Sequence, residues 1–195
     1  MRLTRHQMYT RIFSALPLPL AGDILGVSGL KYWRGSPHYT PPVKVIADDA
    51  RITEADYPEV DMCSLPYADN TFDWVISDCV LEHVEGNIQT AVDEARRVLK
   101  TGGTAIFTTA FIFPIHWGPQ DLWRCSPGAL RYLCRDFSEI TQCEGWGNRW
   151  AHVLMFLYDP ARDWRIPDRR LSFRRWLATY NERRYPLMTW IVAKK

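Results

Sequence analysis

The stretch from Asp61 to Phe111 constrains the fold more than any other part of the sequence. It holds a β-prone segment at 72–78, apolar residues at helical spacing over 88–100, a pair of glycines and a second β-prone segment at 104–111. Both β-prone segments are apolar at successive positions, which is typical of strands covered on two faces. A strand, a helix and a strand in this order make a crossover between parallel strands. The stretch therefore predicts an α/β fold with a mostly parallel sheet.

The remaining strand signals extend this sheet to seven strands with an antiparallel last strand and helices on both faces. The second strand is either 43–48 or 51–57, and the sequence leaves both open. The other expected strands are 23–27, 60–62, 72–78, 104–111, 138–146 and 188–193. The helix at 88–100 presents its apolar stripe at i, i+3, i+4 spacing, through Ile88, Ala91, Val92, Ala95, Val98 and Leu99.

A chain of 195 residues is long enough for one domain with a full core, so we expect one domain over 1–195. The basic, then apolar start (1–21) predicts a packed amphipathic helix from Thr4 to Leu16, because Pro17 and Pro19 interrupt the short apolar run. Five cysteines without C-x-x-C spacing indicate neither a disulfide framework nor a zinc site. These features favour a cytoplasmic protein.

Charge is unevenly distributed along the chain. The segment 161–185 contains eight arginines and three acidic residues, whereas the whole chain has a net charge of only +2. Aromatic side chains, including Phe173 and Trp176, alternate with these arginines. We expect this insertion to border a substrate pocket, where arginine pairs with phosphate or carboxylate. A solvated helix face is the alternative interpretation.

Three phrases in the central stretch, LPYADNTFD, VLEHV and RVLKTGG, resemble class I S-adenosylmethionine-dependent methyltransferases of the type 11 kind. The resemblance implies a Rossmann-like fold, S-adenosyl-L-methionine as cofactor and no metal. It also implies that the cofactor lies at the carboxyl ends of the strands. The residues expected to bind it are Val27, Ser28, Gly29, Asp56, Tyr57, Asp61, Met62, Asp78 and Cys79.

One of these assignments has an alternative. Asp56 is expected at the ribose hydroxyls because a carboxylate has two acceptor oxygens for a vicinal diol, with Asp48 as the rival if 43–48 is the second strand. Asp61 is expected at the adenine amino group, with Met62 over the ring. The first loop departs from the family, because Gly26 stands where an acidic residue is usual.

The loop after the fifth expected strand, FIFPIHWGPQDLWRCSPGALRYL, resembles a subset of these methyltransferases associated with saccharides and small metabolites. His116 is the expected catalytic residue, since histidine has a pKa suited to taking a hydroxyl proton, and His83 is a second candidate. Asp121 and Arg124 are expected to bind substrate; the alternative is an ion pair that fixes the loop.

The sequence thus predicts methyl transfer to an oxygen of a small, anionic or saccharide acceptor. One alternative is a catalytically lapsed cofactor-binding partner subunit, which Gly26 motivates. Another is an arginine-rich module for RNA or a membrane surface, although no nucleic-acid-reading motif is present, so we do not expect nucleic acid as the acceptor.

Overall fold

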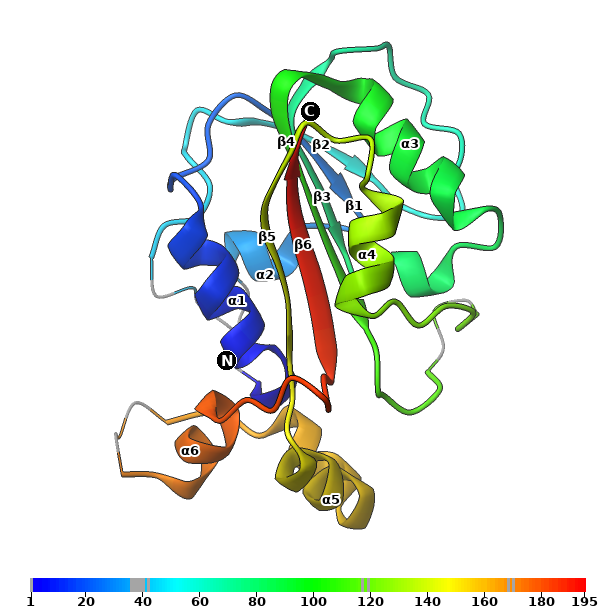
Figure 1. The fold of residues 1–195 in the computed structure, drawn as a ribbon. Coiled ribbons are helices and arrows are strands. Elements are labelled where there is room, and N and C mark those ends of the chain that lie inside the picture. The colour runs from blue at the N-terminus through cyan, green and yellow to red at the C-terminus, as the bar shows by residue number, and fades with distance from the viewer. Residues whose placement is uncertain are drawn as a thin grey trace.

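Six strands form one sheet in the described part of the chain, which comprises residues 2–35, 41, 43–116, 118, 120–167, 169 and 171–195 of a computed structural model (Figure 1). The strand order is β2-β1-β3-β4-β6-β5, and β6 runs antiparallel to both of its neighbours. The strands are β1 (Asp23–Val27), β2 (Arg51–Ala55), β3 (Phe72–Asp78), β4 (Leu99–Ala110), β5 (Glu139–Trp146) and β6 (Met188–Lys194).

The α/β prediction with an antiparallel last strand is confirmed, but the count of seven strands is wrong. Residues 60–62, expected as a strand, lie in turns. The Asp61 carboxylate accepts a hydrogen bond from the Cys63 backbone 2.8 Å away, and such a local bond competes with strand pairing. The second strand is β2, so the alternative at 43–48 is also wrong.

Helices cover both faces of the sheet (Figure 1). α3 and α4 pack on one face, α1 and α2 pack on the other, and α5 and α6 join the core on the α1 side from beyond the end of the sheet. The helices are α1 (Leu3–Ala15), α2 (Lys31–Arg34), α3 (Ile88–Val98), α4 (Pro127–Leu133), α5 (Arg149–Leu157) and α6 (Phe173–Thr179), with short 3-10 helices η1 (Leu81–His83) and η2 (Asp159–Asp163).

α3 forms because its apolar stripe is buried and its first turn is capped. The Asn87 side chain accepts a hydrogen bond from the Gln89 backbone, 2.9 Å away. The helix ends at Val98, earlier than predicted, and β4 begins at the next residue. The two glycines therefore lie within β4, where its pairing with β3 shifts register.

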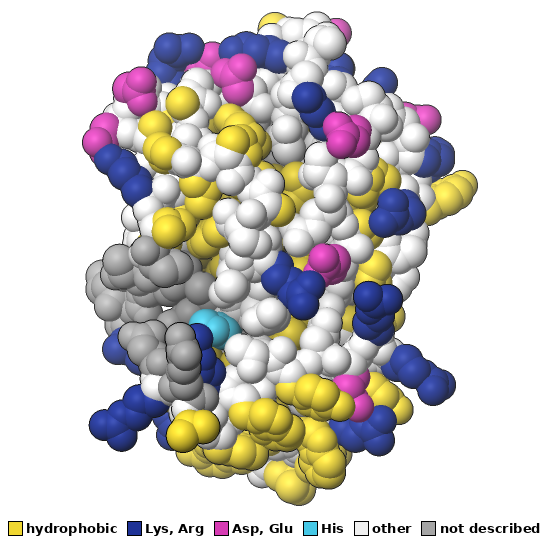
Figure 2. Space-filling view, turned by 60° about the vertical axis from the view of Figure 1, so that its left-hand side comes forward, with side chains coloured by type: hydrophobic (Ala, Val, Ile, Leu, Met, Phe, Trp, Pro, Cys, Tyr) yellow, Lys and Arg dark blue, Asp and Glu magenta, His cyan; other side chains and the backbone are white. Residues whose placement is uncertain are grey.

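α5 and α6 lie at one end of the molecule, beyond the sheet (Figure 1). α5 exposes Trp150, Val153, Phe156 and Leu157, and Figure 2 shows apolar side chains gathered over this end. No helix in the described residues has both the length and the apolar character that a membrane span requires.

Candidate active site

A cavity of about 270 Å³ opens where the first three strands end, and we call it the strand-end cavity. The carboxyl ends of parallel strands meet at one edge of the sheet, and chain order reverses between β1 and β3, where ligands bind in open α/β sheets. The cavity lies at this position. Among the residues predicted to bind the cofactor, those that line it are Val27, Ser28, Tyr57, Asp61, Met62 and Cys79.

The backbone turns sharply at two of these lining residues. Ser28 and Cys79 directly follow β1 and β3, and both adopt left-handed conformations, with φ of 60° and 59°. This region is costly for residues other than glycine and is concentrated at functional sites. A side chain placed on Gly29 would meet no atom within 4 Å, so the space beside the first loop is open to a ligand.

The departure at Gly26 has a packing reason. A Cβ at this position would lie 2.5 Å from Cγ of the buried Leu30, so no larger side chain fits without repacking. The carboxylate usual in the family is therefore replaced by close contact between β1 and the start of α2.

The loop after Asp61 is held by an ion pair on α3. Arg97 donates to the carbonyls of Leu65 and Tyr67 at 2.9 and 2.8 Å, and Glu94 accepts from the Leu65 backbone at 2.9 Å. Arg97 and Glu94 also bind each other at 2.7 Å. This clamp gives the LPYAD phrase a fixed shape beside the cavity.

Three predicted cofactor residues do not line the cavity. Gly29 is the residue after Ser28 in sequence and is not in the cavity lining. Asp56 directly follows β2, and its side chain is exposed to solvent. Asp78 is turned toward α1 and β4, where it accepts hydrogen bonds from Tyr9 and Thr108 and pairs with Arg5 at 3.2 Å. Burial and the neighbouring Asp78 raise the pKa of Tyr9, so its phenol stays protonated and donates. Asp48, the rival ribose ligand, borders a different cavity.

A second cavity, also of about 270 Å³, lies on the other side of Cys79, and we call it the arginine-lined cavity. Arg2 and Arg5 of the N-terminal segment and Arg162 of η2 contribute its cations. Asp163, Glu82 and His116 also line it. Cys79 lines both cavities, so the two adjoin there.

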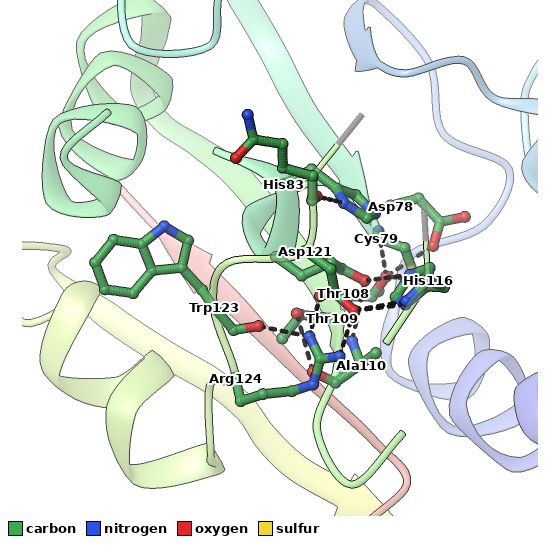
Figure 3. Close-up of polar contacts among 12 residues, drawn as sticks. Asp78, Cys79, His83, Thr108, Thr109, Ala110, His116, Asp121, Trp123 and Arg124 are labelled. Carbon is green, nitrogen blue, oxygen red and sulfur yellow. Dashed lines mark hydrogen bonds and ion pairs between the residues drawn. The ribbon is translucent and has the colours of Figure 1, made fainter. Parts of the chain in front are cut away.

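His116 lies in the loop after β4 and lines the arginine-lined cavity, and Figure 3 shows it beside His83, which lines the strand-end cavity. The Nδ1 of His116 is 3.0 Å from Asp121 Oδ2, an ion-pair distance without hydrogen-bond alignment, and its backbone donates to the same oxygen at 2.9 Å. The His83 ring packs edge-on against the His116 ring, with centroids 4.9 Å apart. Both predicted catalytic residues thus lie together.

Asp121 and Arg124 form an ion pair, the contact that the alternative interpretation of these two residues expects. Hydrogen bonds from Arg124 hold the pKa of Asp121 well below its usual range, so the carboxylate stays charged. Neither residue lines either cavity. They position the His116 loop.

Sequence reasoning missed Arg2 and Arg5 as site residues and did not single out Glu82. The first two are more than seventy residues from Cys79 in sequence, so no local motif connects them. The expected arginine segment contributes Arg162 to the cavity, whereas Arg174 lies 4.5 Å from the Trp164 ring, away from it. Arg170 lies outside the described residues.

Residues 40–107 match the family model described as a methyltransferase domain. The fold is similar to a chain in the complex of the Haloferax volcanii Trm112 methyltransferase activator with a methyltransferase, with 17% identity, a TM-score of 0.58, and coverage of 98% of this chain and 89% of that one. It is also similar to Haemonchus contortus phosphoethanolamine N-methyltransferase 2, solved with phosphomonomethylethanolamine and S-adenosylhomocysteine. That match has 16% identity, a TM-score of 0.56, and coverage of 97% and 53%.

A third similar structure is an S-adenosylmethionine-dependent methyltransferase from Thermotoga maritima, at 14% identity and a TM-score of 0.52, with coverage of 99% and 97%. No curated protein matches the sequence. The family match falls on the segment that supplies most of the strand-end cavity, and its residues suit the cofactor: apolar Met62 and Val60 for a ring, the Asp61 carboxylate for an amino group, and open space over Gly29. Residues 40–107 therefore match a methyltransferase domain, and the chain as a whole has the Rossmann-like fold of class I methyltransferases.

Proposed function

We propose that this chain is an S-adenosylmethionine-dependent methyltransferase that methylates an oxygen of a small acceptor with an anionic group, such as a phosphorylated or acidic saccharide. The observation that carries the proposal is the pair of adjoining cavities. The strand-end cavity suits the cofactor, and the adjoining cavity, which shares Cys79 with it, is lined by three arginines. Arginine pairs with phosphate and carboxylate through two parallel hydrogen bonds.

The chain's own part in the reaction is to bind, orient and exclude water. The bound cofactor supplies a methyl group on a sulfonium, which is intrinsically reactive, so alignment of the acceptor provides much of the rate enhancement. We assign His116 to assist at the acceptor hydroxyl, because it lies at the boundary of the two cavities and imidazole suits proton removal. Asp121 and Arg124 act indirectly by holding its loop.

The test pairs a binding measurement with a turnover measurement. Titration calorimetry with S-adenosylmethionine and S-adenosylhomocysteine should show micromolar binding of both. Turnover should then be faster with a phosphorylated saccharide than with the same saccharide lacking the phosphate. Equal rates with the two acceptors would contradict the anionic acceptor. Cofactor binding without turnover on any acceptor would support the alternative of a lapsed partner subunit.

A further inference from the structure

Three metal-ligating side chains converge at the boundary of the two cavities. Glu82 and His83 lie in η1, just after β3, and His116 lies in the loop after β4. One ligand atom from each lies within 4.8 Å of the other two. The sequence shows no metal spacing, because the fold brings His116 to the other two residues from a different strand end.

Both histidines have an oxygen acceptor beside Nδ1 (Figure 3). His83 Nδ1 hydrogen-bonds with the Gln120 carbonyl, and His116 Nδ1 lies 3.0 Å from the Asp121 carboxylate. Metal-binding histidines are held in this way, with a carbonyl or carboxylate on one ring nitrogen and the metal on the other. The arrangement leaves each Nε2 for a ligand, and that of His116 is 4.0 Å from Glu82 Oε1.

Glu82 provides an independent indication of a cation. Its side chain is fully buried, and Oε1 accepts a hydrogen bond from the Ala110 backbone 3.2 Å away. Oε2 is buried and has no hydrogen-bond partner among the described residues. A buried carboxylate oxygen without a partner is unfavourable, and a bound cation would compensate for its lost hydration.

We propose that Glu82, His83 and His116 bind a divalent transition-metal cation at the boundary between the strand-end cavity and the arginine-lined cavity. Two imidazoles and one carboxylate suit manganese, iron, cobalt or zinc ions, and three protein ligands leave positions open for substrate. The neighbouring Cys79 is not part of this cluster.

The role of this cation rests on the proposed function. The acceptor hydroxyl occupies an open position, where the cation lowers the pKa of the hydroxyl. Its proton passes to solvent while the oxygen forms a bond to the methyl carbon. The carbon–sulfur bond breaks and its electron pair stays on sulfur, which gives the methyl ether and S-adenosylhomocysteine. In this arrangement His116 acts as a ligand of the cation, which replaces its direct role in removing the hydroxyl proton.

The test is the binding of Mn²⁺ alone to the chelator-treated full chain, by calorimetry and electron paramagnetic resonance. Mn²⁺ is chosen because thiols are poor ligands for it and five free cysteines are present. We expect one ion per chain and a loss of affinity of about tenfold or more in Glu82→Gln and His83→Ala. His152→Ala, which changes a histidine away from both cavities, should bind Mn²⁺ like the unmodified chain.

If thermal melting shows that Glu82→Gln does not fold, His116→Ala in the surface loop provides the same comparison. Failure to bind one Mn²⁺, or equal affinity in the ligand variants and His152→Ala, would overturn the proposal. Failure of the proposed function is distinguishable, because Mn²⁺ binding requires no acceptor. A chain that binds Mn²⁺ without turnover contradicts only the function, and full turnover after chelation contradicts the role of the metal.

Discussion

The two cavities adjoin at Cys79, yet the chain builds them differently. The strand-end cavity comes from loops that follow β1, β2 and β3, all within 27–85 apart from Gly118. The arginine-lined cavity gathers residues from the N-terminal segment, η2, β6 and the loop after β4. The first is therefore set mainly by local loop structure, and the second depends on long-range packing. Variants of the first should lose ligand binding, whereas variants of the second should also lose stability.

The largest effect is expected where the long-range packing depends on one buried ion pair. Arg5→Met would leave Asp78, whose side chain is 5% exposed, without its 3.2 Å partner. Removing one member of a buried pair typically costs about 3–5 kcal/mol, and urea unfolding measures this. Arg5→Met combined with Asp78→Asn should be more stable than Arg5→Met alone. A loss of less than about 1 kcal/mol in the single variant would show that α1 is held by other contacts.

A smaller effect, on binding and not on stability, is expected in the strand-end cavity. Asp61→Ala should weaken S-adenosylhomocysteine binding by about 1–3 kcal/mol, the cost of removing a hydrogen-bond partner. Calorimetry measures the change, and an unaltered melting temperature confirms that the loop effect is local. Asp56→Ala tests the predicted ribose contact in the same assay. Unchanged affinity in both variants would refute both assignments.

The acceptor side can be examined with a matched pair of arginines from the same segment. Arg162→Glu should raise KM for an anionic acceptor about tenfold, or about 1.4 kcal/mol, because Arg162 lines the cavity. Arg174→Glu should change KM less than about twofold, since its guanidinium lies over Trp164 and interacts mainly with that ring. Steady-state kinetics of the two variants with the same anionic acceptor measure both KM values. Equal effects would mean that the acceptor contacts the wider arginine surface.

The smallest effect concerns the clamp beside the strand-end cavity and depends on pH. Hydrogen bonds from Arg97 lower the pKa of Glu94 below its ordinary 4.5. The ionised carboxylate therefore stabilises the fold fully above about pH 4.5, and this contribution is lost as pH falls through the lower, folded pKa. We expect Glu94→Gln to lower the free energy of unfolding by about 1 kcal/mol at pH 7 and by less at pH 3. Urea unfolding of both chains at the two pH values measures this difference. A stability difference that stays constant over this range would contradict the clamp.

Sequence reasoning predicted the parallel strands well because their signals are local. β1 and β3 begin and end at the predicted residues, since buried β-branched segments are bounded there by turns. It failed at 60–62, where a side-chain hydrogen bond to the backbone replaces strand pairing. It missed α5, whose outward face is as apolar as its packed face, so no amphipathic pattern marks it.

The residues of the candidate site likewise fall into those that a local motif predicts and those that only the packing of the fold brings together. Six of the nine predicted cofactor residues line the strand-end cavity, because each follows a strand end that a motif identifies. Arg5 could not be predicted, since its partner Asp78 is 73 residues away and only the packing of α1 brings them together. The grouping of Glu82 and His83 with His116 likewise depends on β3 and β4 being neighbours.

The place of β6 in the sheet has a consequence for synthesis on the ribosome. Within the described part of the chain β5 pairs only with β6, so it has no partner when it first leaves the exit tunnel. About forty residues separate the end of β5 from Met188, which at ordinary elongation rates is a delay of roughly two to eight seconds. Throughout that interval the outer edge of β4 is also open. The nascent chain would thus carry the unpaired strand β5 and the open edge of β4 until β6 is made, and this is the stage at which a chaperone would protect it most.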